Sequence, residues 1–104
     1  MQGEKEMVRY VEKSGETMEE AIIILDVESH REGVASEYRY LREKFGKRGE
    51  DWEVELQSLH EQDDRYYDRI LLCFSDGKRK VVYFDITSFF MESMEFFKDV
   101  IGPE

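Results

Sequence analysis

Apolar and polar side chains alternate along this chain with a period that changes from one segment to the next. Residues 21–27 are an almost continuous run of apolar side chains, which is typical of a strand covered on both faces. Thr17 and Glu20, three positions apart, also fit a capping box at the start of a helix. The isoleucines at positions 22–24 favour the strand, because β-branched side chains lose rotamer freedom in a helix. The mixed run at residues 7–11 fits either an edge strand or irregular chain.

The clearest helix signal covers residues 30–45. Ser29 and Glu32 have the spacing of a capping box, and Gly46 provides a stop after the last turn. Between them the apolar positions are spaced four, three and four residues apart: Val34, Tyr38, Leu41 and Phe45. Gly33 is unfavourable in a first helical turn, and its presence indicates a close approach to a neighbouring element.

Residues 52–60 decide between two architectures. From Trp52 onward, apolar and polar side chains alternate with period two, as in a strand with one solvated face. Trp52, Leu56 and Leu59 would also share one face of a helix, since they lie at i, i+4 and i+7. We expect the strand, with its apolar side chains directed inward and its charged side chains toward water.

Asp76 and Gly77 lie between two mostly apolar segments, residues 66–75 and 78–86. An Asp-Gly pair supplies the positive φ angles of a two-residue type I′ turn, so the segments are expected to form a β-hairpin. That turn sets a register with these cross-strand pairs: Leu72 with Val81, Ile70 with Tyr83, Leu71 with Val82, and Arg69 with Phe84.

A second helix is expected at residues 88–101, between two hydroxyl residues that can cap it and Gly102-Pro103. Its main apolar stripe consists of Phe90, Met94, Phe97 and Ile101. Four more apolar side chains widen this stripe beyond what one small sheet covers: Phe89, Met91, Phe96 and Val100. We expect these four side chains to form the interface with a protein partner or with a second copy of the chain.

Together these elements predict a two-layer α+β domain. Its sheet is four-stranded and mostly antiparallel, two helices pack on it, and the order is β-α-β-β-β-α. The strands are expected near residues 21–27, 52–60, 66–75 and 78–86. No repeat, linker or early proline divides the chain, so residues 1–104 are expected to form a single domain with frayed ends at 1–6 and 102–104.

The charge balance limits the classes of partner. Twenty-five acidic residues against fifteen basic ones give a formal net charge of −10, which repels nucleic-acid backbones and anionic membrane surfaces. No apolar run is long enough to span a membrane, and the N-terminal residues lack a signal-peptide pattern, so we expect a cytoplasmic protein. Cys73 is the single cysteine and lies in an apolar run, which predicts a reduced, buried thiol.

No set of side chains with a complete catalytic or cofactor-binding pattern is present. His60, Asp63 and Asp64 are weak candidates for divalent-metal ligands, and a small metal-dependent enzyme around His60 is one alternative function. The spacing lacks the repeat of a calcium loop, and a polar strand connection has the same composition. We therefore expect no cofactor and lean toward a protein that is not an enzyme.

The segment Gly46-Lys47-Arg48-Gly49 resembles the GxxG loop of KH domains, which clamps a nucleic-acid backbone. If residues 51–60 were helical, the order would become β-α-α-β-β-α, as in one KH type. The resemblance then implies single-stranded nucleic-acid binding through Lys47 and Arg48. The acidic residues that follow the loop place negative charge where phosphates would lie: Glu50, Asp51, Glu53 and Glu55. From the sequence we favour a non-enzymatic protein-interaction or regulatory module.

Overall fold

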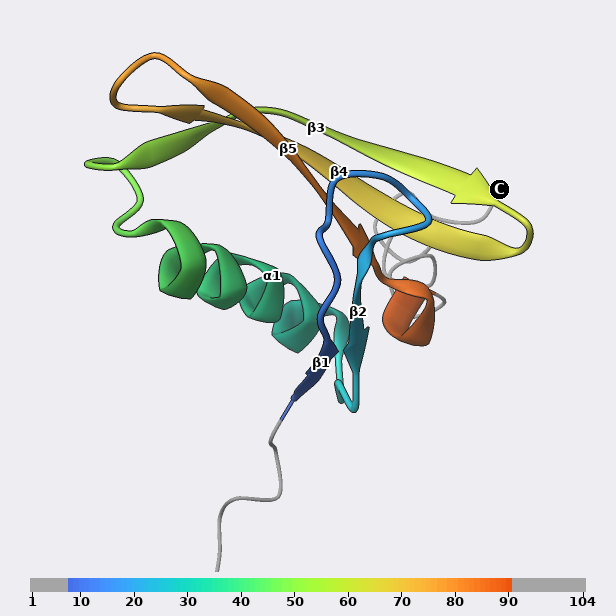
Figure 1. Ribbon diagram of the computed structural model, residues 1–104. Helices are drawn as coiled ribbons and strands as arrows, with labels where there is room; N and C mark the ends of the chain where they lie inside the picture. Colours follow the sequence, from blue (N-terminus) through green and yellow to red (C-terminus); the bar gives the residue numbers. More distant parts are fainter. Residues whose placement is uncertain (1–7, 91–104) are drawn as a thin grey trace, which may run out of the picture.

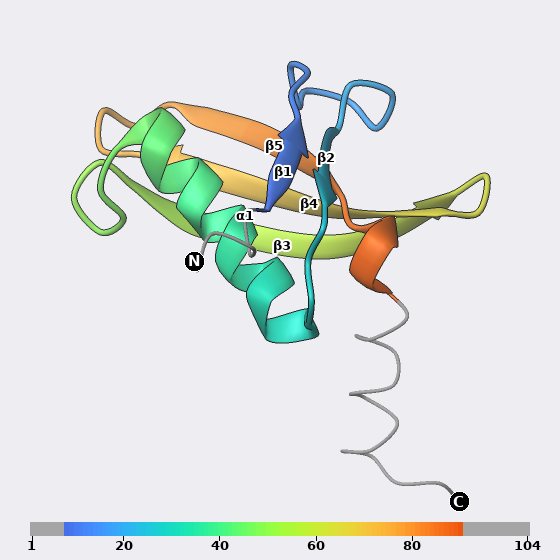
Figure 2. The ribbon, with the colours of Figure 1, turned by 90° about the horizontal axis from the view of Figure 1, so that it is seen from below.

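The computed structural model describes residues 8–90 of the chain. Five strands form one sheet in the order β1-β2-β5-β4-β3. The elements are β1 (Arg9–Val11), β2 (Ile22–Leu25), α1 (His30–Phe45), β3 (Trp52–Gln62), β4 (Arg65–Phe74) and β5 (Arg79–Asp85). A second helix begins with a turn at residues 87–90. Figures 1 and 2 show α1 and this turn on the same side of the sheet, so the domain has two layers.

The predicted α+β class and the two helices are confirmed, whereas the four-stranded sheet is wrong. The sheet has a fifth strand, β1, which pairs antiparallel with β2. Tertiary contacts stabilise this three-residue strand, because the Tyr10 hydroxyl donates to the Ser36 carbonyl at 2.8 Å. The sheet is also mixed, since β2 lies parallel to β5 with Ile22 opposite Phe84. Because residues 52–62 form strand β3, the alternative order β-α-α-β-β-α is wrong.

Helix α1 begins and ends as its sequence predicts. The Ser29 side chain accepts a hydrogen bond from the Glu32 amide at 3.1 Å, and the Gly46 amide donates to the Arg42 carbonyl at 3.1 Å. The close approach predicted at Gly33 is confirmed as well. A Cβ atom at this position would lie 2.3 Å from Cε2 of Phe89, so the glycine allows the second helix to pack against α1.

The hairpin between β4 and β5 forms, but its predicted register is wrong by one residue. Gly77 has a φ of 91° and its amide donates to the Phe74 carbonyl, whereas Asp76 does not adopt a positive φ. The loop is therefore a tight turn followed by a left-handed glycine, which adds one residue to the connection. As a result Ile70 lies opposite Val82, and Leu72 lies opposite Lys80.

This one-residue shift determines which face each side chain occupies. Ile70, Leu72, Val82 and Phe84 all point toward the helices, and each is at most 2% exposed. Leu71 and Val81 pair on the opposite face and are half-buried.

Strand β3 contains a bulge at Glu55, where the register against β4 shifts between Val54 and Leu56. The extra residue reverses the alternation for the rest of the strand. Trp52 is 2% exposed in the core, as expected, but Leu56 points to the opposite face and is 55% exposed. The expectation that the apolar side chains of this strand all point inward is therefore wrong at Leu56.

The first turn of the second helix is attached firmly to the sheet. The Phe90 ring stacks on Tyr66 with a centroid distance of 3.8 Å, and the Ser88 hydroxyl donates to the Ile24 carbonyl at 2.7 Å. Phe89 is 3% exposed within the chain itself and therefore offers no surface to a partner, contrary to its expected place in an interface. The other three residues of that expected interface lie outside the described residues: Met91, Phe96 and Val100.

Candidate functional site

The predicted metal ligands around His60 occupy a β-turn and the strand before it. Asp63 and Asp64 both have positive φ angles, 56° and 65°, and form the two-residue turn that joins β3 to β4. The His60 Nε2 atom lies 2.8 Å from the Ser58 hydroxyl. Within residues 8–90, no group of three or more His, Cys, Asp or Glu side chains is arranged to hold a metal ion.

Lys47 and Arg48 of the GxxG segment are already engaged within the chain. Lys47 pairs with Glu50 at 3.4 Å, and Arg48 pairs with Glu53 at 3.5 Å. The Arg48 guanidinium also lies 4.8 Å from the centroid of the Tyr38 ring. The loop therefore connects α1 to β3 with its charges paired, and it is followed by a strand where a KH domain would have a helix.

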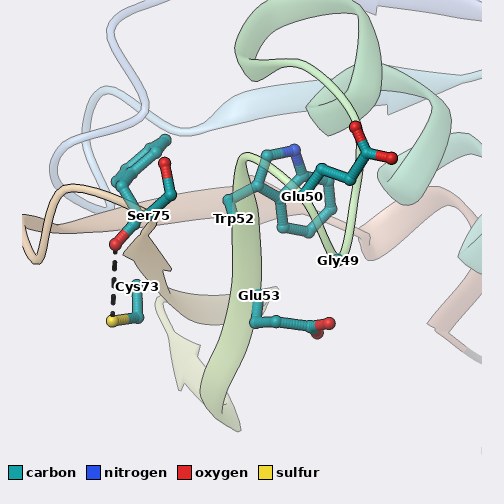
Figure 3. Close-up of a pocket in the computed structure, with 7 residues that line it drawn as sticks. Gly49, Glu50, Trp52, Glu53, Cys73 and Ser75 are labelled. Atoms are coloured by element: carbon teal, nitrogen blue, oxygen red, sulfur yellow. Dashed lines mark hydrogen bonds between the residues drawn. The ribbon is translucent and has the colours of Figure 1, made fainter.

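Cys73 borders a shallow hollow of about 280 Å³ beside the start of β3 (Figure 3). Its thiol is half-exposed and lies 3.9 Å from the Phe74 carbonyl oxygen. The prediction of a buried thiol is wrong, because the register of β4 directs Cys73 to the face opposite α1. Neither histidine lines the hollow, so no imidazole is positioned there to activate the thiol.

The most unusual buried groups are the carboxyls of Glu37 and Asp68, between α1 and β4. Glu37 is 1% exposed and Asp68 is 9% exposed. The Gln57 amide donates to Asp68 Oδ2 at 2.7 Å, and Gln57 Oε1 accepts from the Tyr38 hydroxyl at 3.1 Å. Gln57 faces α1 only because the bulge at Glu55 reverses the alternation of β3.

Burial raises the pKa of Glu37 well above its usual range, and the neighbouring Asp68 carboxylate raises it further. Burial also raises the pKa of Asp68, while hydrogen bonds from Glu37 and Gln57 and the nearby His60 act in the opposite direction. A protonated Glu37 therefore donates a hydrogen bond to Asp68. Among residues 8–90, the Glu37 Oε2 atom has no hydrogen-bond partner. The pair is buried between α1 and β4, so the ionisation of either carboxyl is coupled to the stability of the fold.

The edge of β3 is the one long, unpaired boundary of the sheet within the described residues. β3 has eleven residues and pairs only with β4, whereas the opposite edge strand β1 has three residues. Beyond the contact between Gly49 and Trp52, the outer backbone groups of β3 have no strand beside them in the part of the chain described. Figure 1 shows β3 along the margin of the sheet.

This edge also carries two of the three exposed large apolar side chains found within residues 8–90. Leu56 is 55% exposed and Leu59 is 57% exposed, and the third is Val11 on β1. The pairing of Leu56 with Leu71 and of Leu59 with Asp68 places the two leucines on opposite faces of the sheet. Apolar side chains on both faces of a strand are typical of strands whose two faces are both covered.

No protein family, curated protein or solved structure matches this chain. Within residues 8–90, no helix is long and apolar enough to cross a membrane. Fold and site together define a two-layer α+β domain with a mixed five-stranded sheet. One face of the sheet is uncovered by the described helices, and no described strand lies on the outer side of β3.

Proposed function

We propose that this domain is a non-enzymatic protein-interaction module of the cytoplasm, which binds an extended segment of a partner along the free edge of β3. The observation that carries the proposal is that, within residues 8–90, the eleven-residue β3 has no strand on its outer side and carries exposed Leu56 and Leu59 on its two faces. An added strand would pair with the free backbone groups and cover part of both leucines. The single half-exposed cysteine supports a reducing compartment.

Several features of β3 suit this mode of binding. Its start is fixed by the buried Trp52, whose indole donates to the Gly46 carbonyl at 2.8 Å. The bulge at Glu55 interrupts the edge, and residues 56–62 beyond it pair with β4 without a further irregularity. We call these seven residues the straight segment. This length exceeds that of an average strand. The backbone N–H and C=O groups of alternate residues point outward and are available to pair with an added strand.

The proposal is tested by selecting random twelve-residue peptides from a display library on the full-length protein. Enriched peptides are expected to bind the native chain and to protect amides of β3 from hydrogen exchange. Leu56→Thr combined with Leu59→Thr should weaken that binding while keeping high strand propensity. Val11→Thr, at the other exposed apolar residue, is the matched control and should leave it unchanged. Enriched peptides that protect only amides elsewhere, or no enrichment at all, would refute the proposal.

A further inference from the structure

We infer that the strand bound at this edge is β3 of a second copy, so that two sheets join antiparallel into one continuous sheet of ten strands. This inference rests on the proposed function and names its partner. In an antiparallel pair related by a two-fold axis, each side chain must be compatible in charge and size with the side chain that lies opposite it on the other copy. The straight segment 56–62 meets that requirement in the register centred on Leu59.

In this register Leu59 lies opposite Leu59 of the second copy, at the centre of the straight segment. On the face toward α1, Gln57 then lies opposite Glu61. On the other face, Ser58 lies opposite His60, and Leu56 lies opposite Gln62. Within residues 56–62, every ionisable side chain thus lies opposite a neutral one. The exposed Leu59 of each copy is covered by Leu59 of the other copy.

A neighbouring register is less favourable because of its charges. If the axis passed through Ser58, the bulged Glu55 would approach Glu61 of the second copy, and like charges directly opposite each other destabilise a sheet. In the register centred on Leu59, Glu55 lies outside the paired segment, level with Asp63 in the β3–β4 turn of the second copy, and Arg79 Nε contacts the Glu55 carboxylate at 2.6 Å. The register centred on Leu59 therefore keeps like charges out of the paired segment 56–62.

The net charge of −10 on each copy opposes this association. Since the paired edge is short, we expect a weak dimer, with a dissociation constant on the order of 10–100 μM. Salt screens the repulsion between the two acidic bodies, so the dimer should become tighter between 50 and 500 mM sodium chloride. A dimer held by intermolecular ion pairs would respond in the opposite direction.

Sedimentation equilibrium of the full chain at protein concentrations up to 300 μM tests the association. Leu59→Lys places two ammonium groups at the axis and should weaken the dimer by at least 10-fold, an effect of about 1.4 kcal/mol or more. Val11→Lys is the matched control on β1 and should leave the association constant unchanged. A chain that remains monomeric at 300 μM in 500 mM salt would overturn the inference.

Disulfide cross-linking tests the register in a Cys73→Ser background. Leu59→Cys places two thiols directly opposite each other, within the Cα separation that a disulfide spans, and should yield a covalent dimer under mild oxidation. Leu56→Cys is the control, because its two copies would lie six residues apart, about 20 Å, and should not cross-link. Equal cross-linking of both variants, or of Leu56→Cys alone, would overturn the register. A monomeric chain that still binds selected peptides at β3 would refute the second copy while leaving the proposed function intact.

Discussion

The buried carboxyl of Glu37 gives the most informative single substitution. Glu37→Gln keeps the size of the side chain and retains an N–H group that can donate to Asp68, but it removes the ionisable group. The folded-state pKa of Glu37 is raised well above 4.5 by burial and by Asp68. Below about pH 4.5 the carboxyl is protonated in both the folded and unfolded chains, so its stabilising contribution is fully present.

Above that pH the unfolded chain releases this proton while the folded chain retains it. The native protein should therefore lose stability relative to Glu37→Gln by about 1.36 kcal/mol for each pH unit, until Glu37 ionises in the folded state. The charged and titratable groups around it are Asp68 on β4 and His60 on β3, together with the Tyr38 hydroxyl on α1. They are present in both variants, so the difference between the two proteins isolates Glu37 to first order.

The measurement is urea denaturation followed by circular dichroism at half-unit steps from pH 4 to pH 8. The free energy of unfolding of the native chain should fall below that of Glu37→Gln by an amount that grows with pH. Glu43→Gln, which changes an exposed glutamate on the same helix, is the matched control and should run parallel to the native curve. Parallel curves for the native chain and Glu37→Gln would show that Glu37 is not buried as described.

Three further substitutions test the packing of the second helix and the β4–β5 turn. Gly33→Ala should lower the free energy of unfolding by about 1–2 kcal/mol, because overlap with Phe89 outweighs the gain of about 1 kcal/mol in helix propensity. In a Phe89→Ala background the same change should stabilise, and stabilisation in the native background would contradict the contact. Asp85→Asn should cost about 1–3 kcal/mol in thermal unfolding, since the Asp85 carboxylate accepts hydrogen bonds from the amide and the hydroxyl of Thr87. A loss below 0.5 kcal/mol would mean that these bonds do not hold the helix start. Gly77→Ala should cost about 1 kcal/mol through its positive φ alone, as no atom lies within 4 Å of the added methyl, and an unchanged midpoint of denaturation would refute the left-handed conformation.

Local chemistry in the sequence determined where most elements begin and end. Ser29 and Gly46 delimit α1 through hydrogen bonds that involve only neighbouring residues, so their spacing was sufficient. The isoleucines of β2 and the alternation after Trp52 likewise predicted strands, because β-branched side chains and period-two patterns favour extended backbone at any position.

Two further sequence signals correspond to features of the structure. Glu37 lies three residues after Val34 and four before Leu41, on the apolar face of α1, and this position indicates a buried carboxyl. Asp63 and Asp64, which tolerate positive φ, follow a strand directly and indicate the two-residue turn. The turn lies within an uninterrupted polar run, and this run contains no glycine of the kind that marks the β4–β5 turn.

Tertiary structure alone decided which side chains share a face and which backbone edge stays free. The register of β4 against β5 depends on one residue of loop length, and the face of Leu56 depends on one extra residue at Glu55. Both are set by packing against α1, where Ile70 and Phe84 must lie in the core. The candidate site at β3 depends on this packing, because the strand order of the whole sheet determines which strand lies at its edge. The sequence by itself therefore determined the type and approximate bounds of most helices and strands. Their packing against one another determined the strand order, the burial of the Glu37–Asp68 pair and the exposure of Leu56 and Leu59.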